Sequence, residues 1–346
     1  QGINGLIAVD AYNGHVIWRY KIKGLLAAYN GDELMGTAGT GSNLCVGDDY
    51  VFVRHEGRCL QLDAATGTLK REIKTPARPD GKPGIWGYIA SEKGILYGTV
   101  ANQKHIVTYR YRATTGDMKK LLTESHSIFA IDPTTGKKLW QHRAKESIRH
   151  NAIAIGGGRV YLIDRPLALF DRKKRSKKRV HPLGHLVALN AKTGDVIWSK
   201  KEKIYGTMLA VSNKHNALLM SYQPTRFRLD SETGGRMAVF QADDGTRKWD
   251  IKAGYRSRPM INDYTIYAEG GSWDLLTGEA RPFNFKRSYG CGILAGSKNM
   301  MLFRSATLGY FDLTAKKQST QDFHEQQKNA SFQKTMCLKR KQMVGY

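Results

Sequence analysis

The chain has 346 residues, 41% of them hydrophobic and 36 of them glycine, which is enough to bury one large core and to form many tight turns. No run of 18 apolar residues occurs, which excludes a membrane-spanning helix. The formal net charge of +25 favours anionic partners but does not bear on the fold.

A short pattern recurs along the chain: a strand, a turn that opens with Asp, a Gly four residues later, and a Trp four residues after the Gly. The first copy is Leu6–Trp18, LIAVDAYNGHVIW, and close copies are Ile128–Trp140 and Leu186–Trp198. The Asp carboxylate can accept backbone N–H groups just ahead of it, and the Gly allows the positive φ that starts the return strand. The pattern therefore predicts a β-hairpin whose second strand carries a bulky aromatic side chain.

Four copies are complete or nearly so. Their key residues are Asp10, Gly14 and Trp18; Asp132, Gly136 and Trp140; Asn190, Gly194 and Trp198; and Gln241, Gly245 and Trp249. Two further copies keep the turn without the Trp: one has Arg71 in that position, and the other has Arg281 and Pro282 around it. Trp140 and Trp198 are 58 residues apart, and Trp198 and Trp249 are 51 apart. A period near 50 that is built from strands and turns indicates propeller blades.

Two more short strand patterns precede each hairpin, so each unit has the four antiparallel strands of one blade. The sequence predicts an all-β propeller with almost no helix, in which each Trp lies on the outermost strand, between blades, with its N–H bonded to a carbonyl. Complete blades are expected at about 41–75, 85–145, 150–203, 205–253 and 258–286. Two partial blades are expected as well: residues 1–23, and a last blade from Tyr289 that lacks its fourth strand because neither Gly nor Trp follows Asp312.

Both ends of the chain depart from a closed ring. The sequence begins with Gln1 inside a blade, and the segment after Asp312 is polar and basic. We expect residues 1–313 to form a propeller that is incomplete at both ends and belongs to a longer protein, and the first partial blade could complete the last one. We expect residues 314–346 to be a disordered extension or the product of a reading-frame error.

The hairpins resemble the repeats of PQQ-like (pyrroloquinoline quinone) β-propellers, which include quinoprotein alcohol dehydrogenases and the propeller lipoprotein of outer-membrane protein assembly. More narrowly, three segments resemble a bacterial group of large PQQ-like repeat proteins of unassigned activity. These are residues 147–166, 218–229 and 283–313. The resemblance covers about residues 1–313, and it implies the fold more strongly than the activity. It also implies a periplasmic or otherwise exported protein.

The resemblance leaves two classes of function open. Quinoprotein dehydrogenases of this kind carry adjacent cysteines against the cofactor, whereas Cys45, Cys59, Cys291 and Cys337 include no adjacent pair. This departure favours a non-catalytic scaffold that binds a protein or another ligand. The alternative is an alcohol or sugar dehydrogenase that depends on PQQ with calcium. No catalytic residue can be assigned.

Other features of the sequence give weaker indications of function. The run Asp171–Arg179 has seven basic residues and one acidic residue, and it is either a site for a polyanion or a solvated insertion. No aromatic residues interleave the run, so a nucleic-acid partner is not expected. His181 and His185 could offer two metal ligands, but histidines in a loop beside a basic run are more often exposed to solvent. No metal site is therefore predicted. The glycines of residues 36–43 lead into a strand rather than a helix, which argues against a phosphate-binding loop.

The entries to the first strands form the candidate binding site, because the first strand of each blade lines the central axis of a propeller. Aligned, these entries contain Arg149, His150, Arg256, Arg258 and Arg287, with Trp86, Tyr88, Tyr205 and Tyr289 between them, and no Asp or Glu. One interpretation is that the arginines pair with carboxylates on neighbouring loops. The other is an electropositive, aromatic-walled channel mouth that binds an anion, of which the tricarboxylate PQQ is one example.

The cysteines are expected to be reduced or buried. Cys45 is placed in the first strand of its blade and Cys59 in the third, which sets their backbones about 9–10 Å apart. A disulfide requires Cα atoms within about 7 Å, so no bridge is expected between them. Cys291 is expected to be a small buried hydrophobic residue.

Overall fold

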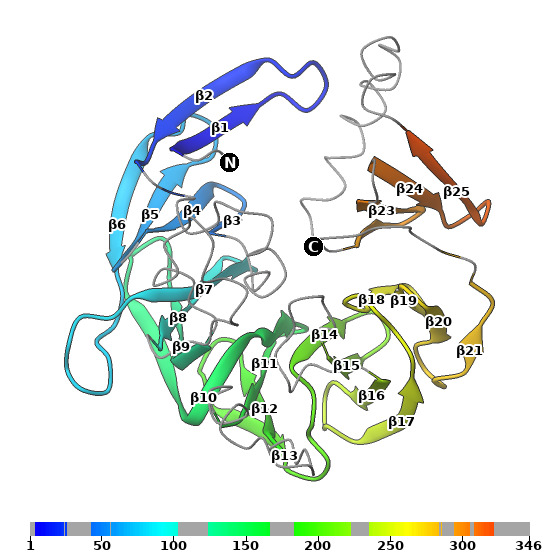
Figure 1. Ribbon diagram of the computed structural model, residues 1–346. Coiled ribbons are helices and arrows are strands. Elements are labelled where there is room, and N and C mark those ends of the chain that lie inside the picture. The colour runs from blue at the N-terminus through cyan, green and yellow to red at the C-terminus, as the bar shows by residue number, and fades with distance from the viewer. Residues whose placement is uncertain are drawn as a thin grey trace, which may run out of the picture.

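The computed structural model describes residues 4–23, 25, 43–55, 57–102, 124–166, 183–222, 235–283, 285, 294–304 and 308–321. All the regular secondary structure within these residues is β-strand. The described part therefore contains no helix that could cross a membrane. The sheets are antiparallel and follow one another in chain order around a common centre (Figure 1). The fold is an all-β propeller of four-stranded blades, as the repeat pattern predicted.

Four sheets are single blades whose four strands pair in sequence order. The first consists of β3 (Leu44–Val46), β4 (Tyr50–His55), β5 (Arg58–Asp63) and β6 (Leu69–Lys74). The second consists of β14 (Met208–Ser212), β15 (Ala217–Ser221), β16 (Gly235–Gln241) and β17 (Arg247–Ala253). The third consists of β18 (Met260–Asn262), β19 (Thr265–Ala268), β20 (Gly271–Asp274) and β21 (Ala280–Arg281). The fourth consists of β22 (Ala295–Ser297), β23 (Met300–Arg304), β24 (Leu308–Asp312) and β25 (Lys317–Gln321).

Two further blades are fused into one seven-stranded sheet. Its strands are β7 (Trp86–Glu92), β8 (Ile95–Ala101), β9 (Glu124–Ile131), β10 (Lys138–Gly156), β11 (Arg159–Asp164), β12 (His185–Asn190) and β13 (Val196–Lys200). The long strand β10 is the fourth strand of one blade and the first strand of the next. Where it passes between them, the Asp164 carboxylate accepts the N–H groups of Lys145, Glu146 and Ser147 at 2.6–3.1 Å. These bonds satisfy backbone donors that the interrupted ladder leaves unpaired.

The prediction that the last blade lacks its fourth strand was wrong, because β25 pairs with β24 along its whole length. The turn between them keeps the Asp chemistry: Asp312 Oδ1 accepts the N–H groups of Thr314 and Ala315 at 2.8 and 2.9 Å. Lys316 takes the positive φ, at 54°, that Gly takes in the other hairpins. A lysine can adopt this left-handed conformation at a modest cost, so the absence of Gly did not prevent the turn.

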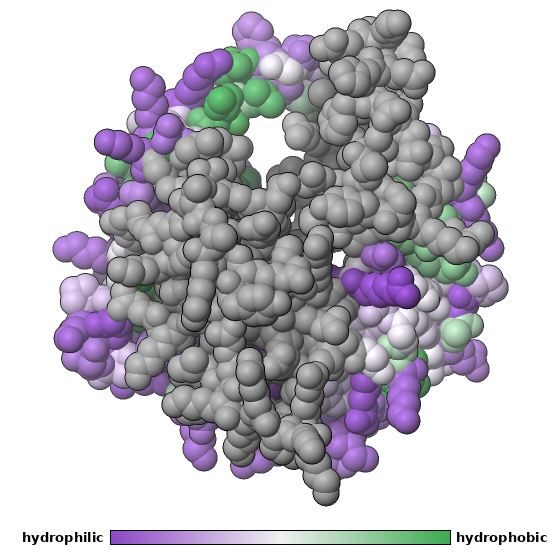
Figure 2. Space-filling model, viewed as in Figure 1, coloured by the Kyte–Doolittle hydropathy of each residue, from purple (hydrophilic) through white to green (hydrophobic). Residues whose placement is uncertain are grey.

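The first blade is represented by a separate two-stranded sheet of β1 (Gly5–Val9) and β2 (Val16–Lys21). It pairs with no strand of the last sheet within the described residues, so the first partial blade does not complete the last one there. The face of this hairpin that points away from β3–β6 exposes Ile7 and Ile17. Figure 2 shows the corresponding apolar patch over β1 and β2, against an otherwise mostly hydrophilic rim.

The predicted contact between Trp and the neighbouring blade is confirmed at four junctions. In each, the indole of the fourth strand lies on the hairpin Gly of the next blade, and its Nε1 donates to the carbonyl that follows the turn-opening residue. The pairs are Trp18 with Ala64 O (3.0 Å), Trp140 with Ala191 O (3.0 Å), Trp198 with Ala242 O (3.2 Å) and Trp249 with Leu275 O (2.9 Å). We call this contact the tryptophan latch.

A latch requires glycine in the hairpin for two reasons, the positive φ of the turn and the close approach of the indole. Gly194 has φ of 79°, and a Cβ on it would lie 2.7 Å from the indole of Trp140. Gly67, Gly245 and Gly278 show the same combination of positive φ and close approach of an indole. The Asp…Gly…Trp spacing therefore encodes two things: the hairpin, and the surface on which the preceding blade packs.

The turn carboxylates couple hairpin stability to pH. The Thr66 backbone N–H lowers the pKa of Asp63, and the Thr135 hydroxyl lowers that of Asp132. A carboxyl with a lowered folded-state pKa stabilises the fold above its unfolded pKa, and this stabilisation is lost as pH falls through the folded value. We expect the urea midpoint to decrease below about pH 4.

The variant Asp132→Asn should lose less of its urea midpoint on acidification than the parent chain. The amide can replace the carboxylate, because Asn190 Oδ1 accepts the N–H groups of Lys192 and Thr193 in the same turn. The exposed Asp243, which accepts no such bond, is the control: Asp243→Asn should leave the acid profile unchanged. Parallel acid profiles for the parent chain and Asp132→Asn would contradict this assignment.

Candidate functional site at the blade entries

The aromatic residues predicted to line the channel are mostly engaged in packing. Trp86 is 1% exposed and packs edge-on against Phe129, with ring centroids 4.9 Å apart. Tyr205 is 5% exposed and stacks on Tyr222 at 5.5 Å. Trp86 is therefore a core residue of the β7–β9 region rather than an exposed wall, because its side chain points between sheets.

Tyr205 is held from three sides. Its hydroxyl donates to Asp250 Oδ1 at 3.1 Å, and the Arg236 guanidinium lies 4.5 Å from the ring centroid. Arg236 also makes two hydrogen bonds to the Asp250 carboxylate, at 2.7 and 2.8 Å. Burial, and secondarily the Asp250 charge, raises the pKa of Tyr205, so the phenol stays protonated at physiological pH. Through Arg236 of β16 and Asp250 of β17, these contacts hold the segment that enters β14 against the outer strands of its own blade.

Arg149 is neutralised by a carboxylate from a neighbouring strand. It lies opposite Glu124 in the β9–β10 ladder, and its Nε donates to Glu124 Oε1 at 3.0 Å. Both side chains are almost completely buried, at 4% and 3% exposure. Arg149 therefore pairs with a carboxylate, but with one on a strand and not on a neighbouring loop as that interpretation expected. The carboxylate comes from the start of β9 rather than from another entry.

His150 belongs to a buried chain of polar groups that joins four strands of its sheet, β7 to β10. Ser125 Oγ lies 2.7 Å from His150 Nε2 and 2.7 Å from Thr99 Oγ1, and Thr99 Oγ1 also accepts the Tyr88 N–H at 2.7 Å. A Cβ on Gly87 would lie 2.5–2.7 Å from all three polar side chains, so only Gly fits there. Ser125 is 0% exposed and His150 is 2% exposed, which suits a structural network better than a nucleophile and its base.

The remaining entry arginines differ from one another. Arg256 is exposed, and its backbone N–H donates to Glu269 O at 2.8 Å. Arg258 is half-buried, and its Nη2 donates to Asn151 Oδ1 at 3.1 Å, which connects the entries of two blades. Tyr88 is half-buried near His150, with ring centroids 6.5 Å apart. Arg287 and Tyr289 lie outside the described residues.

Two buried arginines that sequence reasoning missed brace the same entries. Arg54 Nη1 donates to Trp86 O at 3.1 Å, and Arg165 Nη1 donates to the carbonyls of Tyr205 and Gly206 at 3.3 Å. Each arginine comes from the end of a second strand and crosses to the next blade. Glu124, Ser125 and Thr99 were missed for a similar reason: they lie on second and third strands, and only the first-strand entries were aligned.

The described entry residues do not form a pocket suited to PQQ. That cofactor is a planar tricarboxylate, which calls for an exposed aromatic face and uncommitted cations. Trp86 and Tyr205 are instead packed, and Arg149 is ion-paired. No group of three His, Cys, Asp or Glu side chains that could hold a metal occurs in the part of the chain that the structure describes.

The described cysteines occupy the strands expected for them. Cys45 lies in β3 and Cys59 in β5, with β4 between, and both are free thiols. Burial raises the pKa of the Cys59 thiol, which keeps it protonated. Cys291, Cys337, His181 and the basic run 171–179 lie outside the described residues; His185 begins β12, opposite Asp164.

Comparison with known proteins agrees with this architecture. A family model described as outer membrane protein assembly factor BamB matches residues 111–272. The quinoprotein alcohol dehydrogenase PedH of Pseudomonas putida is 38% identical over 89 residues, which is 23% of this chain and 12% of that relative. The match thus spans a small part of the relative's length.

The solved structure of a designed protein shows the same fold at low sequence identity. The computationally designed Ika8 protein is 14% identical, with a TM-score of 0.54 over 92% of this chain and 83% of that chain. BamB from Moraxella catarrhalis is 13% identical, with a TM-score of 0.49 over 80% of this chain and 73% of that chain. At these identities the likeness concerns the fold alone.

Proposed function

Because the chain is a β-propeller of PQQ-like repeats, related both to BamB and to quinoprotein dehydrogenases, we propose that it acts as a non-catalytic scaffold that binds a protein or an anionic ligand. The blades supply rigid packing in either role, so the fold does not distinguish the two. The choice depends on the entry residues. On the resemblance to PQQ-like propellers, we propose a periplasmic or otherwise exported location for this chain.

One observation carries the proposal: the entry groups that would serve a cofactor are committed to one another. Arg149 is buried against Glu124, and Tyr205 is buried between Tyr222 and Arg236. A quinone would have to break these contacts before it could stack or pair there, and separating a buried ion pair costs about 3–5 kcal/mol. Arg256 is an entry cation that is exposed to a partner.

The alternative, a PQQ-dependent dehydrogenase, rests on the similarity of one segment to PedH. PQQ with calcium would be its cofactor. A titration of the purified chain with PQQ and calcium separates the two roles. We expect neither a saturable change in the quinone absorption band nor dye reduction with primary alcohols. Stoichiometric quinone binding that is followed by alcohol-dependent dye reduction would overturn the scaffold proposal.

A further inference from the structure

Two blade junctions in the described part of the chain, those after β6 and after β21, lack the tryptophan latch, and the one after β6 differs from the four latched junctions in a specific way. Between β6 and the β9–β10 hairpin, Arg71 occupies the position of the Trp. Its Nη2 donates to Thr134 O at 3.1 Å, and a Cβ on Gly136 would lie 2.3 Å from Nη1. The guanidinium thus takes the place of an indole on the hairpin Gly. The carbonyl of Pro133, which corresponds to the one that accepts Nε1 in a latch, accepts Gln61 Nε2 at 3.0 Å.

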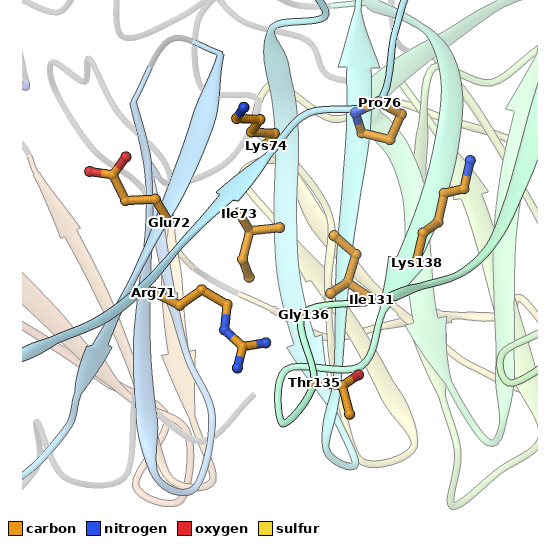
Figure 3. Close-up of a pocket in the computed structure, with 9 residues that line it drawn as sticks. All are labelled: Arg71, Glu72, Ile73, Lys74, Pro76, Ile131, Thr135, Gly136 and Lys138. Atoms are coloured by element: carbon orange, nitrogen blue, oxygen red, sulfur yellow. The ribbon is translucent and has the colours of Figure 1, made fainter.

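A groove of about 350 Å³ opens at this junction (Figure 3). Its lining comes from four consecutive residues of β6, from Pro76, and from the hairpin of the next blade. β6 is the outermost strand of its sheet, so the groove runs along a strand edge with which no strand of the described residues pairs. Ile73 and Ile131, at 4% and 2% exposure, give it an apolar floor. Such an edge can pair with an extended peptide through main-chain hydrogen bonds.

The groove is strongly cationic. Arg71, Lys74 and Lys138 border it, and Arg71 Nη1 is a buried donor with no hydrogen-bond partner. The carboxylate in the lining, Glu72, points away from the hairpin in Figure 3 and pairs with Arg58 at 2.9 Å. A positively charged cleft favours carboxylates, which form charge-assisted hydrogen bonds with ammonium and guanidinium groups.

We propose that this groove binds an acidic, extended peptide segment of a protein partner, with its carboxylates on Arg71, Lys74 and Lys138 and its backbone along β6. The groove lies on the outer strands, away from the blade entries, so the inference does not depend on whether the entries bind a ligand. Charge complementarity and the free strand edge together select a peptide over a compact anion.

The test is isothermal titration of the chain with an acetylated, amidated hexaglutamate peptide over a salt series. We expect saturable binding that weakens with salt. Replacing Lys74 and Lys138 with Gln should weaken binding about tenfold or more, since charge-assisted hydrogen bonds are lost. The matched control replaces Lys248 and Lys252, which are exposed on the outer strand β17, with Gln and should leave the affinity unchanged.

A second variant, Arg71→Trp, restores the latch. The carbonyl of Pro133 can take a second donor, as Ala191 O does from both Trp140 Nε1 and Tyr97 OH. We expect this variant to lose peptide binding while its Tm rises by about 2–4 °C. A raised Tm rules out misfolding as the cause of lost binding.

Three results would overturn the proposal. One is the absence of saturable binding by the parent chain. Another is an equal loss of affinity in the Lys74/Lys138 variant and in the Lys248/Lys252 control. That result would indicate nonspecific attraction of the peptide to a basic protein, in which the lysines beside β6 serve only to protect the strand edge. The third is complete displacement of the peptide by millimolar inorganic phosphate, which would indicate a site for a compact anion instead.

Discussion

Replacing Trp140 with Ala should destabilise the chain by about 3–5 kcal/mol, the cost of removing a large buried aromatic side chain. Trp140 is 7% exposed, donates to Ala191 O, and lies on Gly194 of the next blade. Its removal leaves a cavity between two blades of the seven-stranded sheet. Thermal and urea unfolding followed by far-ultraviolet circular dichroism measure the loss without depending on the Trp itself.

Two matched variants separate the contributions to the latch. Trp140→Phe keeps an aromatic ring but loses the donor, so it should cost only about 1–2 kcal/mol. Trp18→Ala removes the same latch from the half-buried β1–β2 hairpin and should cost less than Trp140→Ala, because less area leaves water when this latch forms. If Trp18→Ala were as damaging as Trp140→Ala, burial between blades would not be the source of latch stability.

The repeat pattern predicted the architecture because its local and long-range signals agree. In the Asp63, Asn190 and Asp274 copies, the same residues specify the turn, the positive φ and the indole seat. The pattern failed at Asp312, where it demanded a Gly although Lys316 can adopt the same φ. The pattern also predicted two separate strands where the continuous strand β10 joins two blades. Nothing in the sequence of residues 138–156 shows that the Asp164 carboxylate accepts the backbone N–H groups between the two blades.

The site was harder to predict than the fold. Alignment of first-strand entries found Arg149 and His150, which do lie side by side on β10. It also suggested an anionic ligand, because no entry contains Asp or Glu. The carboxylate that pairs with Arg149 comes from residue 124, on the neighbouring strand β9. Cross-strand partners depend on register, which a sequence specifies only through contacts between distant residues.

This buried pair gives the second large effect. Replacing Arg149 with Met leaves Glu124 without the guanidinium that neutralises it, and replacing Glu124 with Met removes the carboxylate that faces Arg149. Each single variant should cost about 3–5 kcal/mol, because a charge stays buried after its partner is lost. Both effects are measurable by urea unfolding at neutral pH.

The double variant, with Met at both positions, decides whether the two residues act as a unit. Apolar side chains of similar size can replace a buried ion pair at little cost, so the double variant should be more stable than either single variant. His150 and Ser125, which share these strands, stay unchanged and keep their 2.7 Å contact. Additive losses in the double variant would show that Arg149 and Glu124 stabilise the entry independently. In that case, Arg149 would remain a group that a ligand could recruit.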